Sequence, residues 1–193
     1  MGTDIHLWVE ILQEGRWVFA HPHYFDSGDG AVETYDPEVT WVEWEQPYRV
    51  RNYALFALLA NVRNHDNRFT PLSFPRGVPG DLSDIGRLIA RDGEEGLYHT
   101  FSWLTLEELL DHDWDAPCSM ESGYVPADEV DDFVRHGQAP SLLKSSAVGR
   151  HTVRVERPLT FAEMAGAFHD ELLPLLKSLG APDRVRIVFC FDS

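Results

Sequence analysis

The start of the chain places an aspartate and a histidine on the same side of a predicted strand. In TDIHLWVE, residues 3–10, apolar residues alternate with Asp4, His6, Trp8 and Glu10. This two-residue period predicts a strand with one face in the core. Asp4 and His6 lie on its other face, where a carboxylate beside an imidazole can transfer protons or bind a metal.

Asp192 is the third residue of this candidate site. It follows VRIVFCF, residues 185–191, an apolar run that predicts a central strand at the end of the chain. Because the termini of a domain often lie close together, we expect Asp4, His6 and Asp192 to meet at one sheet edge. Two carboxylates and one imidazole are ligands that zinc, manganese or iron accepts. The alternative is an ordinary solvated sheet face.

His99 is the fourth candidate catalytic residue. It belongs to HTFSWLTLEEL, residues 99–109, which we expect to be a loop followed by a helix that begins near Leu106. Loops on a rigid scaffold often carry functional side chains. Ser102 lies in the same segment, but no Gly-x-Ser-x-Gly motif surrounds it, so we do not expect a serine nucleophile.

Arginines are concentrated in residues 49–80, which hold five arginines and one acidic residue in a chain of net charge −16. Arg51 and Asn52 begin RNYALFALLANVRN, a predicted helix whose N-terminus favours anions. Arg76 lies in the glycine-containing loop FPRGVPGD. We expect Arg51, Asn52, Arg76 and Trp103 to bind a small anion such as a phosphate or a carboxylate. The alternative is that these arginines pair with acidic neighbours.

The elements that must position these residues are strands and helices in mixed order. A hairpin over residues 3–20, helices after Asn52 and Ser83, and a terminal strand predict an α+β fold. We expect a single domain over residues 1–193, with a mixed or antiparallel sheet and helices packed on one face. Thr105 with Glu108, and Thr160 with Glu163, have the spacing of capping boxes.

Composition excludes several classes of function. Residues 81–132 hold 15 acidic residues and two basic ones, so we expect no general nucleic-acid binding. No apolar stretch approaches the roughly 20 residues that cross a membrane. The N-terminus has no signal-peptide pattern, and Cys118 and Cys190 lack metal-type spacing. We therefore expect a cytoplasmic protein with reduced thiols.

Five segments together resemble a family of uncharacterised proteins from bacteriophages and bacteria. They are DIHLWVE, RNYALFALLANVRN, PRGVPGDLS, HTFSWLTLEEL and VRIVFCFDS. The resemblance covers most of the chain and implies variable insertions near residues 21–48 and 112–150. It implies no activity. Where relatives show a His-x-His-x-Trp run, this chain has Phe101 in place of the second histidine.

These residues support two hypotheses about function. In the first, Asp4, His6, His99 and Asp192 form one site beside the predicted anion-binding arginines. Such a site would hydrolyse a small phosphorylated, nucleotide-like substrate with the help of a divalent metal. In the second, the protein binds without catalysis. It would sequester a small anionic ligand or present an acidic face to a basic protein partner.

Overall fold

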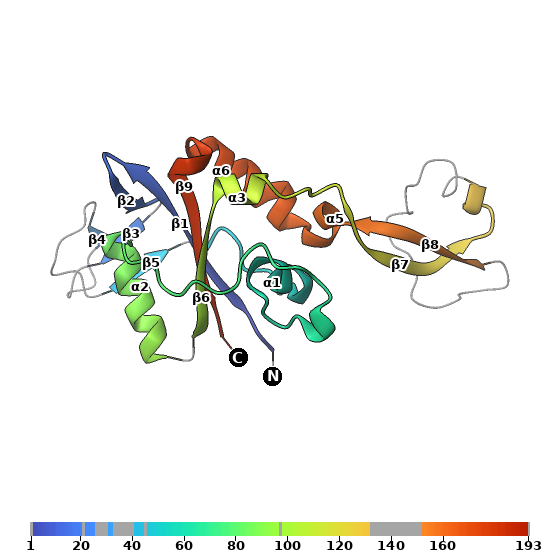
Figure 1. Cartoon of the computed structure of the whole chain (residues 1–193), viewed down its shortest axis with the longest axis horizontal. Coiled ribbons are helices and arrows are strands. Elements are labelled where there is room, and N and C mark those ends of the chain that lie inside the picture. The colour runs from blue at the N-terminus through green and yellow to red at the C-terminus, as the bar shows by residue number, and fades with distance from the viewer. Residues whose placement is uncertain are drawn as a thin grey trace. The chain divides into compact units, whose positions relative to one another are not determined.

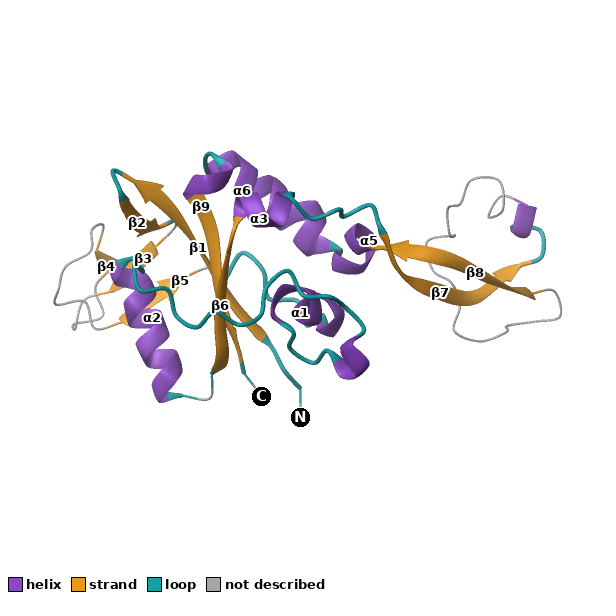
Figure 2. Ribbon diagram, in the orientation of Figure 1, coloured by secondary structure: helices purple, strands orange, loops and turns teal. Residues whose placement is uncertain are grey.

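The computed structural model describes residues 2–20, 22–25, 31–32, 41–44, 46–96, 98–131 and 152–192. The chain forms two compact units. The first consists of Met1–Asp113 with Ala165–Ser193, and the second of Trp114–Met164. The second unit falls largely within the expected insertion near residues 112–150. Figures 1 and 2 show the elements of each unit.

A four-stranded antiparallel sheet forms the centre of the first unit, in the order β2-β1-β9-β6. Its strands are β1 (Ile5–Gln13), β2 (Arg16–Phe19), β6 (His99–Thr105) and β9 (Val185–Phe191). The first and last strands of the chain are therefore neighbours and central, as predicted. His6 pairs with Cys190 in this register. The α+β class and the antiparallel sheet are confirmed.

Helices pack on both faces of this sheet, which corrects the expectation of one covered face. On one face, the Phe56 ring of α1 (Tyr53–Ala60) lies 5.0 Å from the Phe191 ring. On the other face, α2 (Asp84–Glu95) contributes Ile85 and Ile89 to a cluster with Trp8. The reason is that β9 is apolar on both faces, and all seven of its residues are buried.

Local sequence signals fix where the helices begin. Asn52 accepts a hydrogen bond from the Leu55 N–H at 3.1 Å and caps α1. Thr105 and Glu108 form the predicted capping box of α3 (Leu106–Leu110).

The first unit also contains a π-helical segment (Phe168–Leu172), which precedes α6 (Leu173–Leu179). Short 3₁₀ turns span His65–Asn67 and Pro182–Arg184.

The segment around His99 is a strand, where we expected a loop. It forms β6, at the edge of the sheet, and a bulge interrupts its pairing with β9 between His99 and Ser102. Thr100, inside the bulge, has φ +56°. The loop that precedes α2 lies along this edge, because the Gly77 N–H donates to the Phe101 carbonyl at 2.9 Å. The bulge hides the two-residue period by which a strand is recognised.

A second, three-stranded sheet in the first unit has the order β4-β3-β5. Its strands are β3 (Pro22–Phe25), β4 (Ala31–Val32) and β5 (Trp41–Trp44). These strands fall within the expected insertion near residues 21–48, and the remainder of residues 21–45 lies outside the described residues.

The second unit contains an antiparallel pair of strands. They are β7 (Pro117–Pro126) and β8 (Thr152–Thr160), followed by α5 (Phe161–Ala165). Arg157 donates to Glu121 at 2.9 Å and to Glu163 at 2.5 Å, and Glu163 completes the predicted capping box with Thr160. Residues 132–151 lie outside the described part of the chain.

Two further sequence predictions concern the whole chain. Both cysteines are free thiols, as predicted. Burial, and then the charge of Asp192, raise the pKa of the Cys190 thiol to about 12. No helix in the described part of the chain has the length and apolar character needed to cross a membrane.

Candidate functional site

His6 and Asp192 contact each other, as predicted. The His6 Nε2 atom lies 3.2 Å from Asp192 Oδ2. The backbone N–H of Asp4 donates to Asp192 Oδ1 at 2.8 Å, and the N–H of Asp192 donates to the Asp4 carbonyl at 3.1 Å. The contact between Asp4 and Asp192 therefore involves the Asp4 backbone rather than its carboxylate.

The imidazole of His6 is enclosed on several sides. Its Nδ1 atom lies 3.3 Å from Gln46 Nε2, and its ring stacks on Tyr98 with the centroids 4.1 Å apart. The His6 side chain is 17% exposed. Both ring nitrogens thus have protein partners, so a ligand would have to displace one of these hydrogen bonds.

The Asp4 carboxylate binds Arg51 in a bidentate pair. Arg51 Nε donates to Oδ1 at 2.8 Å, and Arg51 Nη2 donates to Oδ2 at 2.5 Å. The hydrogen bonds from Arg51 hold the pKa of Asp4 below its usual value, and Asp4 raises the pKa of Arg51 in turn. Arg51, predicted to bind an anionic ligand, instead holds a carboxylate of its own chain.

The metal site expected from Asp4, His6 and Asp192 is not assembled. Among the described residues, no group of three or more His, Cys, Asp or Glu side chains is arranged to hold a metal ion. The physical reason is that Arg51 engages both carboxylate oxygens of Asp4, while both nitrogens of His6 already have partners.

The other predicted ligand-binding residues also have protein partners. Arg76 Nη1 donates to Glu108 Oε2 at 3.0 Å, its Nη2 contacts Oε1, and its Cζ lies 4.6 Å from the centroid of the Trp103 ring. Asn52 caps α1. The alternative in which the arginines pair with acidic residues therefore describes Arg51 and Arg76.

His99 and His6 lie on opposite faces of the sheet, which corrects the expectation of a single site. His99 pairs with Phe191, whereas His6 pairs with Cys190. Consecutive residues of a strand face opposite sides. The stacking of the His99 ring on Phe191, at 6.4 Å between centroids, is consistent with this placement. The residues predicted to act together thus form two separate clusters.

His99 lines a pocket of about 440 Å³ next to α1. The pocket lies wholly within the first unit. The residues that line it are Thr3, Ala60, Asn61, Val62, Arg63, Pro75, His99 and Thr100. His99 Nδ1 lies 2.8 Å from the Thr100 hydroxyl. Within the described part of the chain, His99 Nε2 has no hydrogen-bond partner. This nitrogen is therefore available to a ligand.

Arg63 is the second basic group of this pocket, and the sequence prediction did not include it. Its Nε and Nη2 donate to the Thr3 hydroxyl at 2.9 and 2.7 Å, and its Cζ lies 5.6 Å from the Tyr53 ring centroid. The signal in the sequence was the arginine-rich stretch 49–80. It did not distinguish Arg63 from Arg51, since only the fold shows which arginine borders a pocket.

Three residues that line the pocket have left-handed backbone conformations without being glycine. The φ angles are +60° at Asn61, +56° at Arg63 and +56° at Thr100. A β-branched residue such as Thr100 rarely adopts this conformation, because its side chain clashes with the backbone. Strained backbone is found often at functional sites, where it positions a side chain. At Thr100 it brings the hydroxyl to His99.

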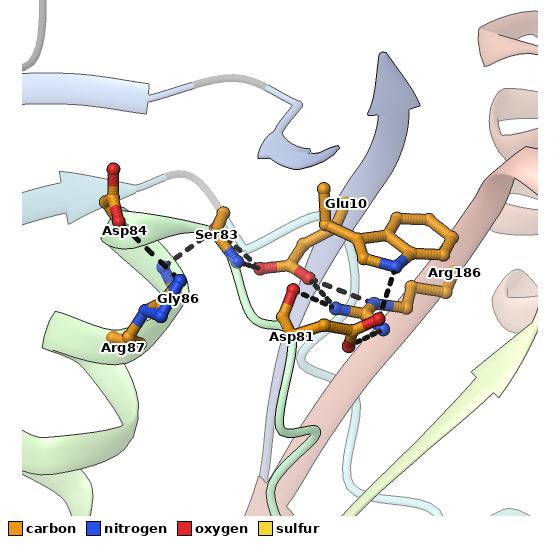
Figure 3. A network of polar contacts seen from close by, with 8 residues as sticks. Glu10, Asp81, Ser83, Asp84, Gly86, Arg87 and Arg186 are labelled. Atoms are coloured by element: carbon orange, nitrogen blue, oxygen red, sulfur yellow. Dashed lines mark hydrogen bonds and ion pairs between the residues drawn. The ribbon is translucent and has the colours of Figure 1, made fainter. Parts of the chain in front are cut away.

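A second polar cluster, buried except for Asp81, lies where β1, β9 and the start of α2 meet (Figure 3). Glu10 is fully buried, and Arg186, 2% exposed, donates to Glu10 Oε2 from Nε at 3.0 Å and from Nη2 at 2.7 Å. Ser83 donates to the other oxygen of Glu10, Oε1, at 2.5 Å. Asp81 accepts from Arg186 Nη1 at 2.8 Å. Because these groups bind one another, the cluster links β1, β9 and the start of α2.

Comparisons with protein-family models, with curated proteins and with solved structures find no match. The resemblance to a phage and bacterial family therefore stays a prediction.

Proposed function

We propose that the pocket between α1 and β6 binds a small phosphorylated ligand. The observation that carries this proposal is the composition of its wall. Arg63 and His99 line it together with Thr3 and Thr100, and none of the described lining residues is acidic. Guanidinium, imidazole and hydroxyl groups are the donors that bind phosphate oxygens. The volume of the pocket lies in the range of small-molecule sites.

The net charge of the whole chain makes the absence of described acidic residues from the pocket wall informative. The chain carries a net charge of −16, so a surface chosen at random would contain carboxylates. A pocket with two basic groups and no described acid is a local exception to that charge. It supports the binding of a small anion more than the binding of a basic protein by the acidic residues 81–132. That second possibility stays a prediction.

Titration calorimetry with inorganic phosphate tests this function. We expect Arg63→Gln to weaken phosphate binding about tenfold or more, because the loss of a charge-assisted hydrogen bond costs about 1.5–3 kcal/mol. Arg68→Gln is the matched control, since Arg68 is an exposed arginine that does not line the pocket. Equal affinities in the two variants would contradict the proposal, as would the absence of phosphate binding to the native chain.

A second candidate function, hydrolysis of a phosphomonoester, follows from the hydrogen bonds of His99. The Thr100 hydroxyl forms a hydrogen bond with Nδ1 of His99, so Nε2 of His99 can transfer a proton. In this reaction water adds to phosphorus, the ester P–O bond breaks, and the leaving alcohol gains a proton. His99 Nε2 would accept the proton of the water and return it to the alcohol. The proposal uses no metal, since the residues expected to bind one are engaged elsewhere.

The hydrolysis of p-nitrophenyl phosphate distinguishes this reaction from binding alone. We expect His99→Gln to abolish turnover and His65→Gln, at an exposed histidine outside the pocket, to preserve it. Phosphate binding with no turnover above the buffer rate would restrict the function to binding.

We also propose a cytoplasmic location, because both thiols are free.

A further inference from the structure

Two exposed aromatic residues are neighbours of residues that line the pocket. Seven large hydrophobic side chains are exposed among the described residues, namely Val50, Tyr53, Phe74, Val78, Met120, Val153 and Leu175. Tyr53 and Phe74 are the aromatic members of this set, with exposed fractions of 40% and 67%. Tyr53 contacts Thr3 and Arg63 of the pocket wall, whereas Phe74 directly precedes Pro75 of the wall in the sequence.

Tyr53 borders the pocket beside its arginine. The Tyr53 hydroxyl accepts a hydrogen bond from the backbone N–H of Thr3 at 3.3 Å. Arg63 Cζ lies 5.6 Å from the Tyr53 ring centroid. Both Thr3 and Arg63 line the pocket, so the ring of Tyr53 lies directly next to the basic part of its wall.

Phe74 belongs to a segment that is held in place. It immediately precedes Pro75, which lines the pocket. Around it, the backbone N–H of Arg76 donates to the Ser102 hydroxyl at 3.3 Å, and the Arg76 side chain donates to the Ser73 hydroxyl at 2.8 Å. Isolated exposed apolar residues need no explanation, but an exposed aromatic side chain on a held segment, next to a residue that lines a polar pocket, offers a stacking surface.

We propose that the phosphorylated ligand of this pocket carries an aromatic base, as a nucleoside monophosphate does. Its phosphate binds Arg63 and His99, and its base stacks on Phe74, with Tyr53 on the side of Arg63. This inference rests on the proposed phosphate site and adds the chemical class of the ligand. Base–aromatic stacking supports binding without hydrogen bonds to the base, so it tolerates different bases.

Calorimetry of the full chain with adenosine 5′-monophosphate (AMP), ribose 5-phosphate and inorganic phosphate tests this inference. We expect AMP to bind roughly 5- to 150-fold more tightly than ribose 5-phosphate, which is the stacking contribution of one base. Phe74→Ala should remove most of this difference and leave the affinity for ribose 5-phosphate within about twofold. Met120→Ala is the control, because Met120 is similarly exposed at 62% and neither lines the pocket nor neighbours a lining residue in the sequence.

The outcomes separate the two proposals. Equal affinities for AMP and ribose 5-phosphate would overturn the stacking inference and leave the phosphate site intact. An AMP preference that persists in Phe74→Ala would also overturn it. Failure of all three compounds to bind the native chain would contradict the phosphate site itself, and with it the inference.

Discussion

Arg186 and Glu10 form a salt bridge that is almost completely shielded from water, with side-chain exposures of 2% and 0%. Removing Glu10 would leave the buried guanidinium of Arg186 with the exposed carboxylate of Asp81 as its remaining ionic partner in the cluster, and the loss of one partner of a buried pair is strongly destabilising. We therefore expect Glu10→Ala to lower the free energy of unfolding by about 3–5 kcal/mol, measured by urea denaturation.

The exposed pair of Arg87 and Asp84 provides the control for this prediction. Its atoms are 3.7 Å apart, and both side chains are more than half exposed. Arg87→Ala should change the free energy of unfolding by less than about 1 kcal/mol. If Glu10→Ala were equally mild, the cluster in Figure 3 would not fasten the strands to α2.

Glu108 makes the stability of the folded protein depend on pH. Hydrogen bonds from Arg76, against the opposing effect of burial, hold the pKa of Glu108 below its ordinary value of 4.5. A carboxyl group with a lowered folded-state pKa stabilises the protein above its unfolded pKa. This stabilisation is lost as the pH falls from about 4.5 through the folded-state value.

Arg76→Gln should therefore move the midpoint of acid unfolding to higher pH, as measured by circular dichroism between about pH 7 and pH 2. The shift arises because Glu108 then titrates closer to 4.5. Arg16→Gln, at an exposed arginine of β2, should leave the midpoint in place. An unchanged midpoint in Arg76→Gln would show that the Arg76–Glu108 pair adds nothing to acid stability.

At the level of elements, the bulge in β6 links stability to the candidate site. Thr100 adopts φ +56°, which glycine adopts without a steric penalty. We expect Thr100→Gly to raise the free energy of unfolding by about 1 kcal/mol, since relief of the left-handed conformation exceeds the entropic cost of glycine. The same change should weaken phosphate binding, because the hydroxyl that holds His99 Nδ1 is removed. Urea denaturation and calorimetry measure the two effects.

Glu14→Gly separates these effects. Glu14 has φ +49° in the turn between β1 and β2, and it does not line the pocket. It should gain stability as Thr100→Gly does, without a change in phosphate affinity. A loss of stability in Thr100→Gly, or phosphate binding equal to that of Glu14→Gly, would contradict the role given to Thr100.

Elements with local signals could be predicted from the sequence, whereas a bulged strand and a contact between residues far apart in the sequence could not. The caps at Asn52 and at Thr105 with Glu108 depend on residues three apart, so the pattern alone indicated them. The strand β6 was not predicted, because its bulge breaks the two-residue alternation of side chains by which a strand is recognised. The burial of Glu10 also escaped prediction, because its partner Arg186 is 176 residues away in the sequence.

At the scale of the molecule, the sequence indicated several residues of the two clusters, but the prediction that His99 belongs to the same site as His6 and Asp192 was wrong. The pairing of β1 with β9 brought His6 to Asp192, as expected from two apolar terminal segments. Pairing of β6 with β9 then placed His99 on the opposite face, which depends on register and cannot be inferred from composition. The pocket therefore combines His99 with Arg63, a residue that only the fold brings beside it.

The central claim is that phosphate binds at the pocket of Arg63 and His99. The most direct measurement is an NMR titration of the ¹⁵N-labelled full chain with inorganic phosphate, which locates the binding site in solution. We predict saturable changes in amide shift centred on Thr3, Asn61, Arg63, His99 and Thr100. Changes centred on Arg51 or Arg76, or no saturable change, would contradict the claim.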